Sequence, residues 1–520
     1  EKEIRTEIAS GWQFRQKDSG EWLPATVPGT VHTDLMANGK IEDPFYRMNE
    51  LGLQWIDKKD WEYKTVFFVD GNLIEKKNQR LIFKGLDTYA DVYLNGEQLG
   101  SADNMFRTWV FDIAGKLKAG NNELRVVFAS PTRRGLEEMK RYGLRLPADN
   151  DQSERGEMGK DRVSVYTRKA PYHYGWDWGP SLVTSGIWRP VQLEVWDGMK
   201  VEDVYIKQAE VSGKLAALSA NVRVKADDVQ NVEVEILNDG KILVAAKEKL
   251  KKGENDISVP FDIVNPRLWW SNGLGKQNLY TFTIRVKGDR GIIAEKEITT
   301  GLRSLKLVRK KDQWGESFGL ELNGIAVFAK GANVMPNDIF LPRVTPELYE
   351  KMIADAANAN MNMLRIWGGG IYEDDVFFEL CDRYGIMVWH DFMFACAMYP
   401  GNEEFLNNVR QEAIDNVVRL RNHPCIALWC GNNENALAWR HGSPGGWGWK
   451  QQFTKEQQDT VFKAYYDVFH DLLPRVVDEY MPGCDYWPSS PMAGPEPTQH
   501  GLDGTTSGDQ HYWGVWHGFR

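Results

Sequence analysis

A short apolar run ends in a cluster of amide and carboxyl side chains that could carry acid–base chemistry. The run is part of HPCIALWCGNNEN, residues 423–435, and it ends at Cys430, just before Asn432, Asn433 and Glu434. A carboxyl group beside apolar residues is partly desolvated, which favours its protonated form, and a general acid must be protonated near neutral pH. We therefore predict that Glu434 is a general acid and that Asn433 is a hydrogen-bond donor beside it. The alternative is that the cluster only caps the helix that follows.

Two other apolar runs end in side chains of a similar kind. MNMLRIWGGG places Arg365 and Trp367 at the end of one predicted strand, and IMVWHDF places Asp391 at the end of the next. In a (β/α)8 barrel the C-terminal ends of the strands form the active face, so these residues are expected at the same edge as Glu434. We expect Asp391 to orient its neighbours rather than to react. The acidic residues 373–375 are interpreted as the start of a helix, where carboxylates favour the helix dipole.

Residues 304–520 alternate between short apolar runs and amphipathic stretches, which predicts β/α units around a parallel sheet. Thr345 and Pro346 are typical of a helix start, and Gly385 is typical of a helix end. No glycine-rich nucleotide-binding motif follows a predicted strand, so a (β/α)8 barrel is favoured over a doubly wound sheet. The predicted strands lie within residues 325–336, 361–370, 386–392, 425–430, 485–490 and 508–516, and the last predicted helix covers residues 457–480.

Two all-β domains are predicted to precede this part of the chain. In residues 1–197 short alternating runs are separated by turn residues, with Asn95-Gly96 as the strongest hairpin signal, and this spacing favours a jelly roll. Residues 198–303 contain alternating strands of immunoglobulin-like length, which suit one β-sandwich. The predicted fold is therefore a multidomain β plus α/β chain, with domains at 1–197, 198–303 and 304–520.

The composition excludes several classes of protein. The hydrophobic content of 42% is typical of a globular chain, and the net charge of −10 argues against a nucleic-acid partner. No stretch approaches the roughly 18 consecutive apolar residues that a membrane-spanning helix needs. The five cysteines do not form a disulfide framework, and Cys425 and Cys430 would face opposite sides of one strand, so they would not share a metal. We expect no metal and no cofactor.

Two further features of the composition bear on source and ligand. The chain has no Asn-x-Ser/Thr glycosylation site, which favours a bacterial source. The low cysteine content and the charged start of the chain fit a periplasmic or secreted bacterial protein, with a cytoplasmic location as the alternative. Its 21 tryptophans serve equally well as core filler or as stacking surfaces for sugars. The sequence does not determine the oligomeric state.

Several motifs resemble those of glycoside hydrolase family 2, and the resemblance covers essentially the whole chain. RNHPCIALWCGNNEN, residues 421–435, resembles the acid/base motif of that family, whose barrels end their fourth strand in an Asn-Glu pair. FKGLDTYADVYLNG at 83–96 and NMFRTWVFDI at 104–113 resemble its N-terminal sugar-binding jelly roll, and GLRSLKL at 301–307 resembles the join to its barrel. The family's order of domains agrees with the order predicted above.

Within the family, three motifs are most similar to the β-mannosidases. They are RKAPYHYGWDWGPSLVTSGIWRPV at 168–191, RIWGGGIYE at 365–373 and HDFMFACAMYP at 390–400. The resemblance implies an exo-acting retaining β-mannosidase that removes terminal β-D-mannose from the non-reducing ends of manno-oligosaccharides or glycans. An exo-β-glucosaminidase or a β-galactosidase of the same family, or a non-catalytic carbohydrate-binding relative, remain as alternatives.

The resemblance also implies roles for single residues. Glu434 would protonate the glycosidic oxygen and then activate water, and Asn433 would hydrogen-bond the 2-hydroxyl of the sugar. Arg365 would support the charge of the nucleophile, and Trp367 would form a wall of the sugar pocket. The remaining expected contacts are Trp176 and Asp177 from the jelly roll and Tyr512 and Trp513 at the tip of a sixth strand, whereas Trp178 is equally well explained as core. Apart from the resemblance, the loop after Glu434 is too long and glycine-rich for a plain connection, and we interpret its Trp447 and Trp449 as rim residues.

A retaining glycosidase needs a second carboxylate about 5–5.5 Å from the first. In family 2 this nucleophile is a glutamate at the end of barrel strand seven, and no segment of the printed sequence matches it. We therefore expect the nucleophile, and the C-terminal part of the barrel, beyond Arg520. The substrate is the expected partner, and no nucleic acid or membrane is expected.

Overall fold

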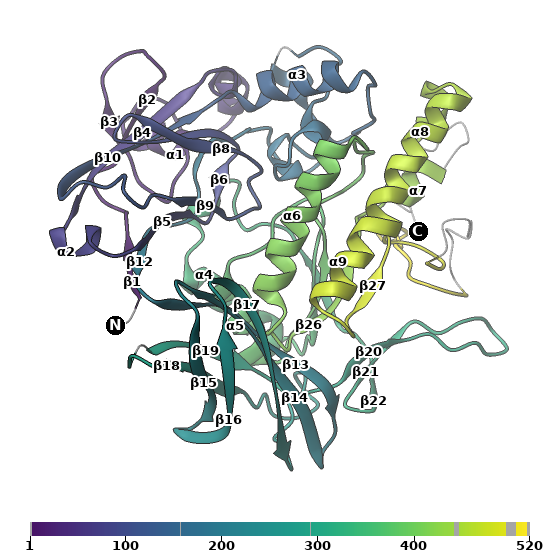
Figure 1. Cartoon of the computed structure of the whole chain (residues 1–520). Helices are drawn as coiled ribbons and strands as arrows, with labels where there is room; N and C mark the ends of the chain where they lie inside the picture. Colours follow the sequence, from purple (N-terminus) through teal and green to yellow (C-terminus); the bar gives the residue numbers. More distant parts are fainter. Residues whose placement is uncertain (1–2, 157, 292, 441–446, 496–505, 517–520) are drawn as a thin grey trace.

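The computed structural model describes residues 3–156, 158–291, 293–440, 447–495 and 506–516. Figure 1 shows three parts in chain order: a β-rich part at the upper left, a second β-rich part at the bottom, and a part with long helices on the right. We refer to them as the first β region (strands β1 to β12), the second β region (β13 to β19) and the β/α region (β20 to β27).

The first β region contains two large antiparallel sheets that enclose one core. Side chains from both sheets, among them Phe14, Phe83 and Leu124, are fully buried between them. The six-stranded sheet has the order β3 (Leu23–Pro24), β2 (Gln13–Gln16), β4 (Trp61–Val69), β10 (Gly120–Phe128), β7 (Tyr89–Leu94) and β8 (Glu97–Asp103). The four-stranded sheet has the order β1 (Ile4–Glu7), β12 (Val191–Trp196), β5 (Asn78–Phe83) and β9 (Trp109–Asp112). A short pair, β6 (Leu86–Asp87) and β11 (Gly186–Ile187), and the helices α1 (Val31–Ala37), α2 (Gly71–Ile74) and α3 (Pro131–Tyr142) complete it.

The hairpin predicted at Asn95-Gly96 is confirmed. Strands β7 and β8 pair antiparallel on either side of it, and both turn residues have positive φ angles, of 50° and 83°. Such angles are what a two-residue hairpin turn requires, and asparagine and glycine adopt them at low cost.

The second β region is a sandwich of two antiparallel sheets. Its strands bury every second side chain, as Val222 and Val224 of β14 do, and this is the pattern of a sheet with one face on a core. One sheet has the order β13 (Met199–Val211), β14 (Leu215–Ala226) and β17 (Gly253–Val264). The other has the order β16 (Lys241–Leu250), β15 (Gln230–Asn238), β18 (Tyr280–Gly288) and β19 (Ile293–Thr300).

The β/α region is built on a parallel sheet whose spatial order follows the chain. Its strands are β23 (Gly331–Val334), β24 (Met363–Ile366), β25 (Met387–Asp391), β26 (Ile426–Cys430) and β27 (Asp485–Trp487). Helices connect them: α4 (Pro346–Asn358), α5 (Asp375–Tyr384), α6 (Glu403–Leu420), α7 (Asn435–Arg440), α8 (Lys455–Tyr466) and α9 (Leu473–Tyr480). A small antiparallel sheet of β20 (Leu305–Val308), β21 (Gly319–Leu322) and β22 (Ile325–Val327) precedes them. A doubly wound sheet would reverse its strand order at a switch point, and this sheet does not reverse over its five strands.

Short helical turns fill several connections. The 3₁₀ turns cover Asn49–Leu53, Ile56–Lys58, Ser153–Gly156, Ser164–Tyr166, Pro171–His173, Leu341–Arg343 and Trp449–Gln452, and a π-helical segment covers Asp467–Leu472. Among the described residues no helix is both long and apolar enough to cross a membrane.

The helix signals read from the sequence of the β/α region are confirmed. The Thr345 side chain accepts a hydrogen bond from the backbone N–H of Leu348 and so caps α4. Helix α5 ends at Gly385, which has a left-handed φ of 76°. Asp375 begins that helix and Asp374 is its N-cap residue, so the interpretation of residues 373–375 as a helix start is also confirmed.

Three predicted elements differ from the structure. The run 325–336 divides between β22 and β23, because its first residues pair with β21 and its last join the parallel sheet. The predicted helix 457–480 is interrupted by the π-helical segment. Residues 508–516 form no strand, because Asp509 and His511 turn toward Ser490 rather than entering the sheet. Apolar periodicity does not specify which sheet a run will join.

The first β region is docked on the β/α region through one shared core. Buried side chains of both regions, including Phe106, Trp176 and Trp367, belong to a single hydrophobic cluster. At its centre Arg168 donates to both carboxylate oxygens of Glu412, at 2.8 and 2.7 Å, and both side chains are almost completely buried. This contact holds the first β region over the C-terminal ends of the parallel strands.

Candidate active site

Four adjacent strands of the parallel sheet contribute polar side chains that meet at its carboxyl edge. Arg365 of β24 donates to Asp391 Oδ2 of β25 at 2.7 Å and to Asn433 Oδ1, beyond β26, at 2.8 Å. It also donates to Asn333 Oδ1 of β23 at 3.1 Å. Parallel strands point their carboxyl ends to one side, which is why residues so distant in sequence come together. One guanidinium group thus links four strand ends.

Asp391 lies in the floor of this arrangement. It is fully buried, and its carboxylate also accepts from Gly368 N–H at 3.0 Å and from Trp389 Nε1 at 2.9 Å. A side chain at Gly368 would place its Cβ 2.4 Å from the Phe394 carbonyl oxygen, so only glycine allows this approach. Burial raises the pKa of Asp391 and the charge of Arg365 opposes that rise. With both oxygens occupied, Asp391 is placed to orient its neighbours, as the sequence predicted.

Arg365 keeps its charge in this environment. Burial lowers its pKa, the Asp391 carboxylate raises it, and the net direction is upward. Its Nε–H is buried and has no hydrogen-bond partner within the described part of the chain. The guanidinium group therefore keeps its Nε–H for a further acceptor.

Asn433 connects Arg365 to Glu434. Because its Oδ1 accepts from Arg365, its Nδ2 must face the other way, and it lies 3.4 Å from both Glu434 Oε1 and Cys396 Sγ. The backbone of Asn433 is held as well, by hydrogen bonds of 3.0 Å to Phe394 and 2.8 Å from Cys396. The Asn433 side chain, predicted as a hydrogen-bond donor beside Glu434, thus presents its Nδ2–H to that residue.

Glu434 occupies a strained backbone position. Its φ of 62° lies in the left-handed region, which costs a glutamate on the order of 1–3 kcal/mol. Two hydrogen bonds hold it there, from its N–H to Ser490 O at 2.8 Å and from Ala438 N–H to its carbonyl at 2.9 Å. The side chain is 10% exposed, so the carboxyl group is sheltered and still accessible at the edge of the sheet.

The structure separates the two interpretations of the NNEN cluster. Asn432 is the capping residue, because its Oδ1 accepts from the backbone N–H of Asn435 at 3.1 Å and from Ser489 Oγ at 2.6 Å. The side chains of Asn433 and Glu434 do not cap the helix. They belong to the polar network around Arg365.

Three tryptophans form an aromatic wall beside this network. Trp367, just after β24, packs edge-on against Trp176 of the first β region, with ring centroids 4.7 Å apart and an interplanar angle of 87°. Trp178 is 5.6 Å from the same Trp367 ring. The loop that carries Trp176 is fixed by Tyr172, which donates its N–H to Gly369 O at 3.0 Å. The structure therefore brings the predicted Trp176 and Trp367 together.

Asp177 lies between Trp176 and Trp178 and is exposed. It makes no hydrogen bond or ion pair with any of the described residues, so its carboxylate is available to a ligand. Trp178 is 51% exposed, so the explanation of this residue as core is wrong. Its ring contacts only the neighbouring rings of Trp176 and Trp367 among the aromatic contacts of the described residues, which leaves about half of it open to solvent.

Tyr512 and Trp513 are not placed as the sequence suggested. They were predicted at the tip of a sixth strand, but residues 509–513 form no strand, and the two side chains are 74% and 50% exposed. The neighbouring His511, which the sequence analysis missed, lies against the site instead. Its Nδ1 is 3.8 Å from Glu434 Oε2 and its Nε2 is 2.9 Å from Ser490 Oγ.

A signal for this contact was present in the sequence. Ser490 follows β27 as Asn433 follows β26, and the rule that polar residues at strand ends gather at one edge applies equally to both. Applied to 485–490, that rule identifies Ser490 as a site residue. It does not identify His511, whose position depends on the path of a chain segment that joins no strand.

The rim assignment of Trp449 is wrong. Trp449 is fully buried and donates its Nε1–H to Asp149 Oδ1, at 3.0 Å, so a carboxylate of the first β region covers its polar edge. Trp447 is partly buried and packs edge-on against Trp449, with centroids 5.5 Å apart. Residues 441–446 of the same loop lie outside the described residues.

Glu373 forms a buried contact with helix α4. It accepts a hydrogen bond of 2.5 Å from Tyr349 OH, and burial raises its pKa to about 7. The described residues contain no cluster of three histidine, cysteine or acidic side chains that could hold a metal ion.

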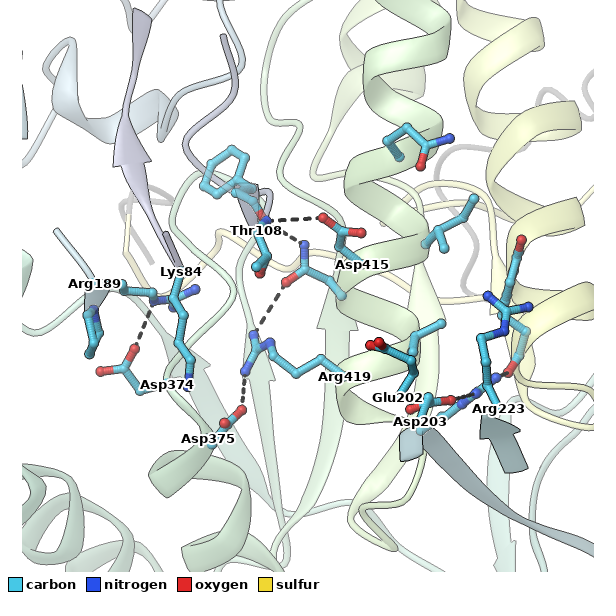
Figure 2. A pocket seen from close by; sticks show the side chains of 18 of the residues that line it. Lys84, Thr108, Arg189, Glu202, Asp203, Arg223, Asp374, Asp375, Asp415 and Arg419 are labelled. Carbon is cyan, nitrogen blue, oxygen red and sulfur yellow. Dashed lines mark hydrogen bonds and ion pairs between the residues drawn. The ribbon is translucent and has the colours of Figure 1, made fainter. Parts of the chain in front are cut away.

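A large cavity of about 1490 Å³ lies at the junction of the three regions and is separate from the predicted site. Figure 2 shows its wall, in which Arg189 pairs with Asp374 at 3.0 Å and Arg419 pairs with Asp375 at 2.7 Å. None of the predicted site residues lines it. Arg189–Asp374 joins the first β region to the β/α region, and Arg421–Asp203 joins the β/α region to the second β region. We therefore interpret this cavity as a space between packed regions rather than as the candidate active site.

Comparison with known proteins agrees with this organisation. Residues 12–189 match the glycosyl hydrolase 2 galactose-binding domain-like family, and residues 199–303 match glycosyl hydrolases family 2. The chain is 36% identical to Beta-mannosidase B of Emericella nidulans, over 98% of this chain and 60% of that protein. It is also 36% identical to Beta-mannosidase B of Aspergillus fumigatus, over 98% and 59%.

Solved structures give the same result. A β-D-mannosidase from Dictyoglomus thermophilum superposes with a TM-score of 0.87 at 38% identity, covering 99% of this chain and 61% of that one. An exo-chitosanase from Amycolatopsis orientalis, at 19% identity, has a TM-score of 0.71 over 98% of this chain and 54% of its own, and shows a shared fold alone. The chain thus spans about 60% of the length of the curated relatives that it matches. The two consecutive family matches, which together cover more than half of the chain, and the agreement along its whole length establish that this chain belongs to glycoside hydrolase family 2.

Proposed function

We propose that the full-length protein is an exo-acting retaining β-mannosidase that hydrolyses terminal, non-reducing β-D-mannose from manno-oligosaccharides or glycans. The observation that carries the proposal is the Arg365–Asn433–Glu434 array at the carboxyl edge of a parallel sheet, beside an aromatic wall. The similarity to proteins named β-mannosidases supports the choice of sugar.

In this proposal Glu434 is the acid/base residue. Its proton passes to the glycosidic oxygen as the bond between that oxygen and the sugar breaks, and it later takes a proton from the attacking water. The position of its carboxyl group supports this role, because the side chain is only 10% exposed and still lies at the edge of the sheet where a sugar can reach it. Asn433 Nδ2, already fixed as a donor, hydrogen-bonds the 2-hydroxyl of the sugar.

The nucleophile is assigned to a glutamate that follows residue 520 in the full-length protein. The greater length of the relatives supports this assignment. Arg365 supplies the matching positive charge, and its unused Nε–H is available to that carboxylate. With a nucleophile at about 5–5.5 Å from Glu434, hydrolysis proceeds with retention through a covalent glycosyl-enzyme.

The proposal also includes the complete (β/α)8 barrel, of which β23 to β27 are the first five strands. Residues 331–333 of the edge strand β23 are exposed, which supports a further strand beside it. The division into domains at 1–197, 198–303 and 304–520 is part of the same proposal. Trp176, Trp178 and Trp367 enclose the sugar on one side, with Asp177 accepting hydrogen bonds from its hydroxyl groups.

A panel of 4-nitrophenyl glycosides tests the proposal with the full-length protein. The β-mannoside is expected to have a kcat/KM at least about 100-fold above those of the β-glucosaminide and β-galactoside, because a missing or misplaced hydroxyl contact costs a few kcal/mol. Preferred hydrolysis of either of the other two sugars would replace the substrate assignment. Binding of mannose without turnover of any substrate would favour the non-catalytic alternative.

A further inference from the structure

His511 connects Glu434 to a hydrogen-bonded pair formed by Ser490 and Asp509. Its Nδ1 is 3.8 Å from Glu434 Oε2, and its Nε2 is 2.9 Å from Ser490 Oγ. The Ser490 hydroxyl also hydrogen-bonds Asp509 Oδ2. The other oxygen of Asp509 accepts from Trp487 Nε1 at 2.9 Å and from Met492 N–H at 2.8 Å. The four side chains therefore form a line that ends on the acid/base carboxyl group.

The chemistry of these groups fixes the direction of each hydrogen bond. A carboxylate has no proton to give, so the Ser490 hydroxyl must donate to Asp509. That hydroxyl has only one proton, so towards His511 its oxygen can only accept. His511 Nε2 must therefore carry the hydrogen, and in the neutral imidazole Nδ1 is then an unprotonated acceptor. This acceptor faces Glu434 Oε2.

We propose, on the basis of the function proposed above, that His511 is a positioning residue that favours the protonated form of Glu434. Its Nδ1 lone pair can accept a hydrogen bond from the Glu434 O–H and offers nothing to the Glu434 carboxylate. The separation of 3.8 Å is longer than a hydrogen bond, and such contacts tighten when the substrate complex forms. Asp509 and Ser490 act through His511 by holding its Nε2–H form.

Other groups around Glu434 do not supply this preference. Asn433 donates to Glu434 Oε1, which favours the carboxylate rather than the acid. The remaining titratable and charged groups near Glu434 and its contacts are Arg365 and Asp391 at the strand ends, Cys396 after β25, and Asp149 of the first β region. Arg365 and Asp391 neutralise each other in an ion pair of 2.7 Å, and burial raises the pKa of the Cys396 thiol, which leaves it neutral.

The proton balance of the reaction is unchanged by His511. In the first step the proton moves from Glu434 to the glycosidic oxygen, and the electron pair of the broken bond stays on that oxygen. In the second step a proton of water returns to Glu434 while the water oxygen bonds to the sugar. His511 takes no part in either proton transfer and only changes which form of Glu434 is favoured.

The sharpest test is Asp509→Asn in the full-length protein. The new side chain keeps an oxygen for Trp487 and Met492, and its amide nitrogen donates to Ser490 Oγ. The Ser490 hydroxyl is then free to donate to His511 Nε2, so the hydrogen of the imidazole moves to Nδ1 and faces Glu434. This reversal favours the carboxylate of Glu434, and we expect the alkaline limb of kcat/KM for mannobiose to move to lower pH by about half to one unit.

Two controls separate this effect from a general loss of structure. In a His511→Phe background the same Asp509→Asn change should leave the alkaline limb where it is, because no imidazole remains to transmit the reversal. With 2,4-dinitrophenyl β-mannoside, whose leaving group needs no protonation, kcat/KM should show no shift in either protein. If Asp509→Asn does not fold, Ser490→Ala is used, which removes the acceptor for Nε2–H and should give a smaller shift in the same direction.

The outcomes distinguish this inference from the proposed function. A wild-type protein that hydrolyses no β-mannoside contradicts the proposed function. A wild-type protein that is active, with an alkaline limb that Asp509→Asn leaves unmoved, contradicts the role of His511 alone. A shift that persists in the His511→Phe background also overturns the inference, because the effect would then reach Glu434 by another route.

Discussion

Arg365 Nη2 donates to Asn433 Oδ1 at 2.8 Å, and this contact decides which end of the Asn433 amide faces Glu434. An amide held by its oxygen presents its NH₂ group to whatever lies on the other side. The arginine thus prepares a donor at the place where the proposed function needs one, before any sugar is bound. Preorganised donors of this kind lose little free energy to reorganisation during the reaction.

Replacement of this donor should lower catalysis rather than stability. Asn433→Ala is expected to reduce kcat/KM for 4-nitrophenyl β-mannoside by about 100-fold or more, because the contact to the 2-hydroxyl strengthens in the transition state. The matched measurement uses the 2-deoxy sugar, on which wild type and variant should differ much less. A loss of the same size on both substrates would mean that Asn433 does not bind the 2-hydroxyl.

Removal of the proposed acid should depend on the leaving group. Glu434→Gln is expected to lose most activity on mannobiose and to retain more on 2,4-dinitrophenyl β-mannoside, whose departing phenolate needs no proton. The two kcat values, each relative to wild type, give the result directly. An equal loss on both substrates would speak against the acid role and leave Glu434 as a binding residue.

Replacement of the exposed Asp177 should change sugar binding without changing the stability of the fold. Because its carboxylate has no partner among the described residues, Asp177→Ala should leave the melting temperature within about 1 °C of wild type. We expect kcat/KM for β-mannosides to fall by roughly 10- to 100-fold, since a hydrogen bond to a charged group contributes about 1.5–3 kcal/mol. Unchanged kinetics would remove Asp177 from the sugar site.

The ion pair between the first β region and the β/α region should contribute to stability. Arg168→Met leaves the Glu412 carboxylate buried without its partner, a loss that costs about 3–5 kcal/mol at such sites. We expect a melting temperature lower by several degrees, measured by calorimetry. The control is Lys351→Met, which breaks the exposed Lys351–Asp355 pair on α4 and should change little. Equal decreases in melting temperature for the two variants would show that the buried pair contributes no more to stability than the exposed one.

A second ion pair should make stability depend on pH. His423 Nδ1 lies 2.6 Å from Asp382 Oδ2. Burial lowers the pKa of His423, the Asp382 carboxylate raises it, and the net direction is upward. A histidine whose pKa is higher in the folded state stabilises the fold fully below its unfolded pKa of about 6.5, and this contribution is lost as pH rises through the folded value. His423→Asn should therefore lower the melting temperature more at pH 5.5 than at pH 8.5. A deficit that is constant with pH, or larger at pH 8.5, would contradict the charged pair.

Local signals in the sequence determined much of this architecture. The Asn95-Gly96 turn, the Thr345 cap and the Gly385 helix end each depend on a few adjacent residues and on φ angles that those residues favour. The strand ends were found in the same way, since each apolar run is bounded by a polar residue. Because all parallel strands end at one edge, finding the ends was enough to place Arg365 and Asn433 together.

Tertiary structure decided what no local pattern encodes. The burial of Trp449 depends on Asp149, which lies 300 residues away, and the division of 325–336 depends on which strands were free to pair. His511, rather than Tyr512 or Trp513, meets Glu434 because Asp509 and Ser490 turn the chain across the sheet edge. The sequence by itself thus determined the elements and the residues at their ends, whose preferences act over a few residues. Only the tertiary structure decided which side chains meet across elements, because contacts between distant segments depend on how whole surfaces pack.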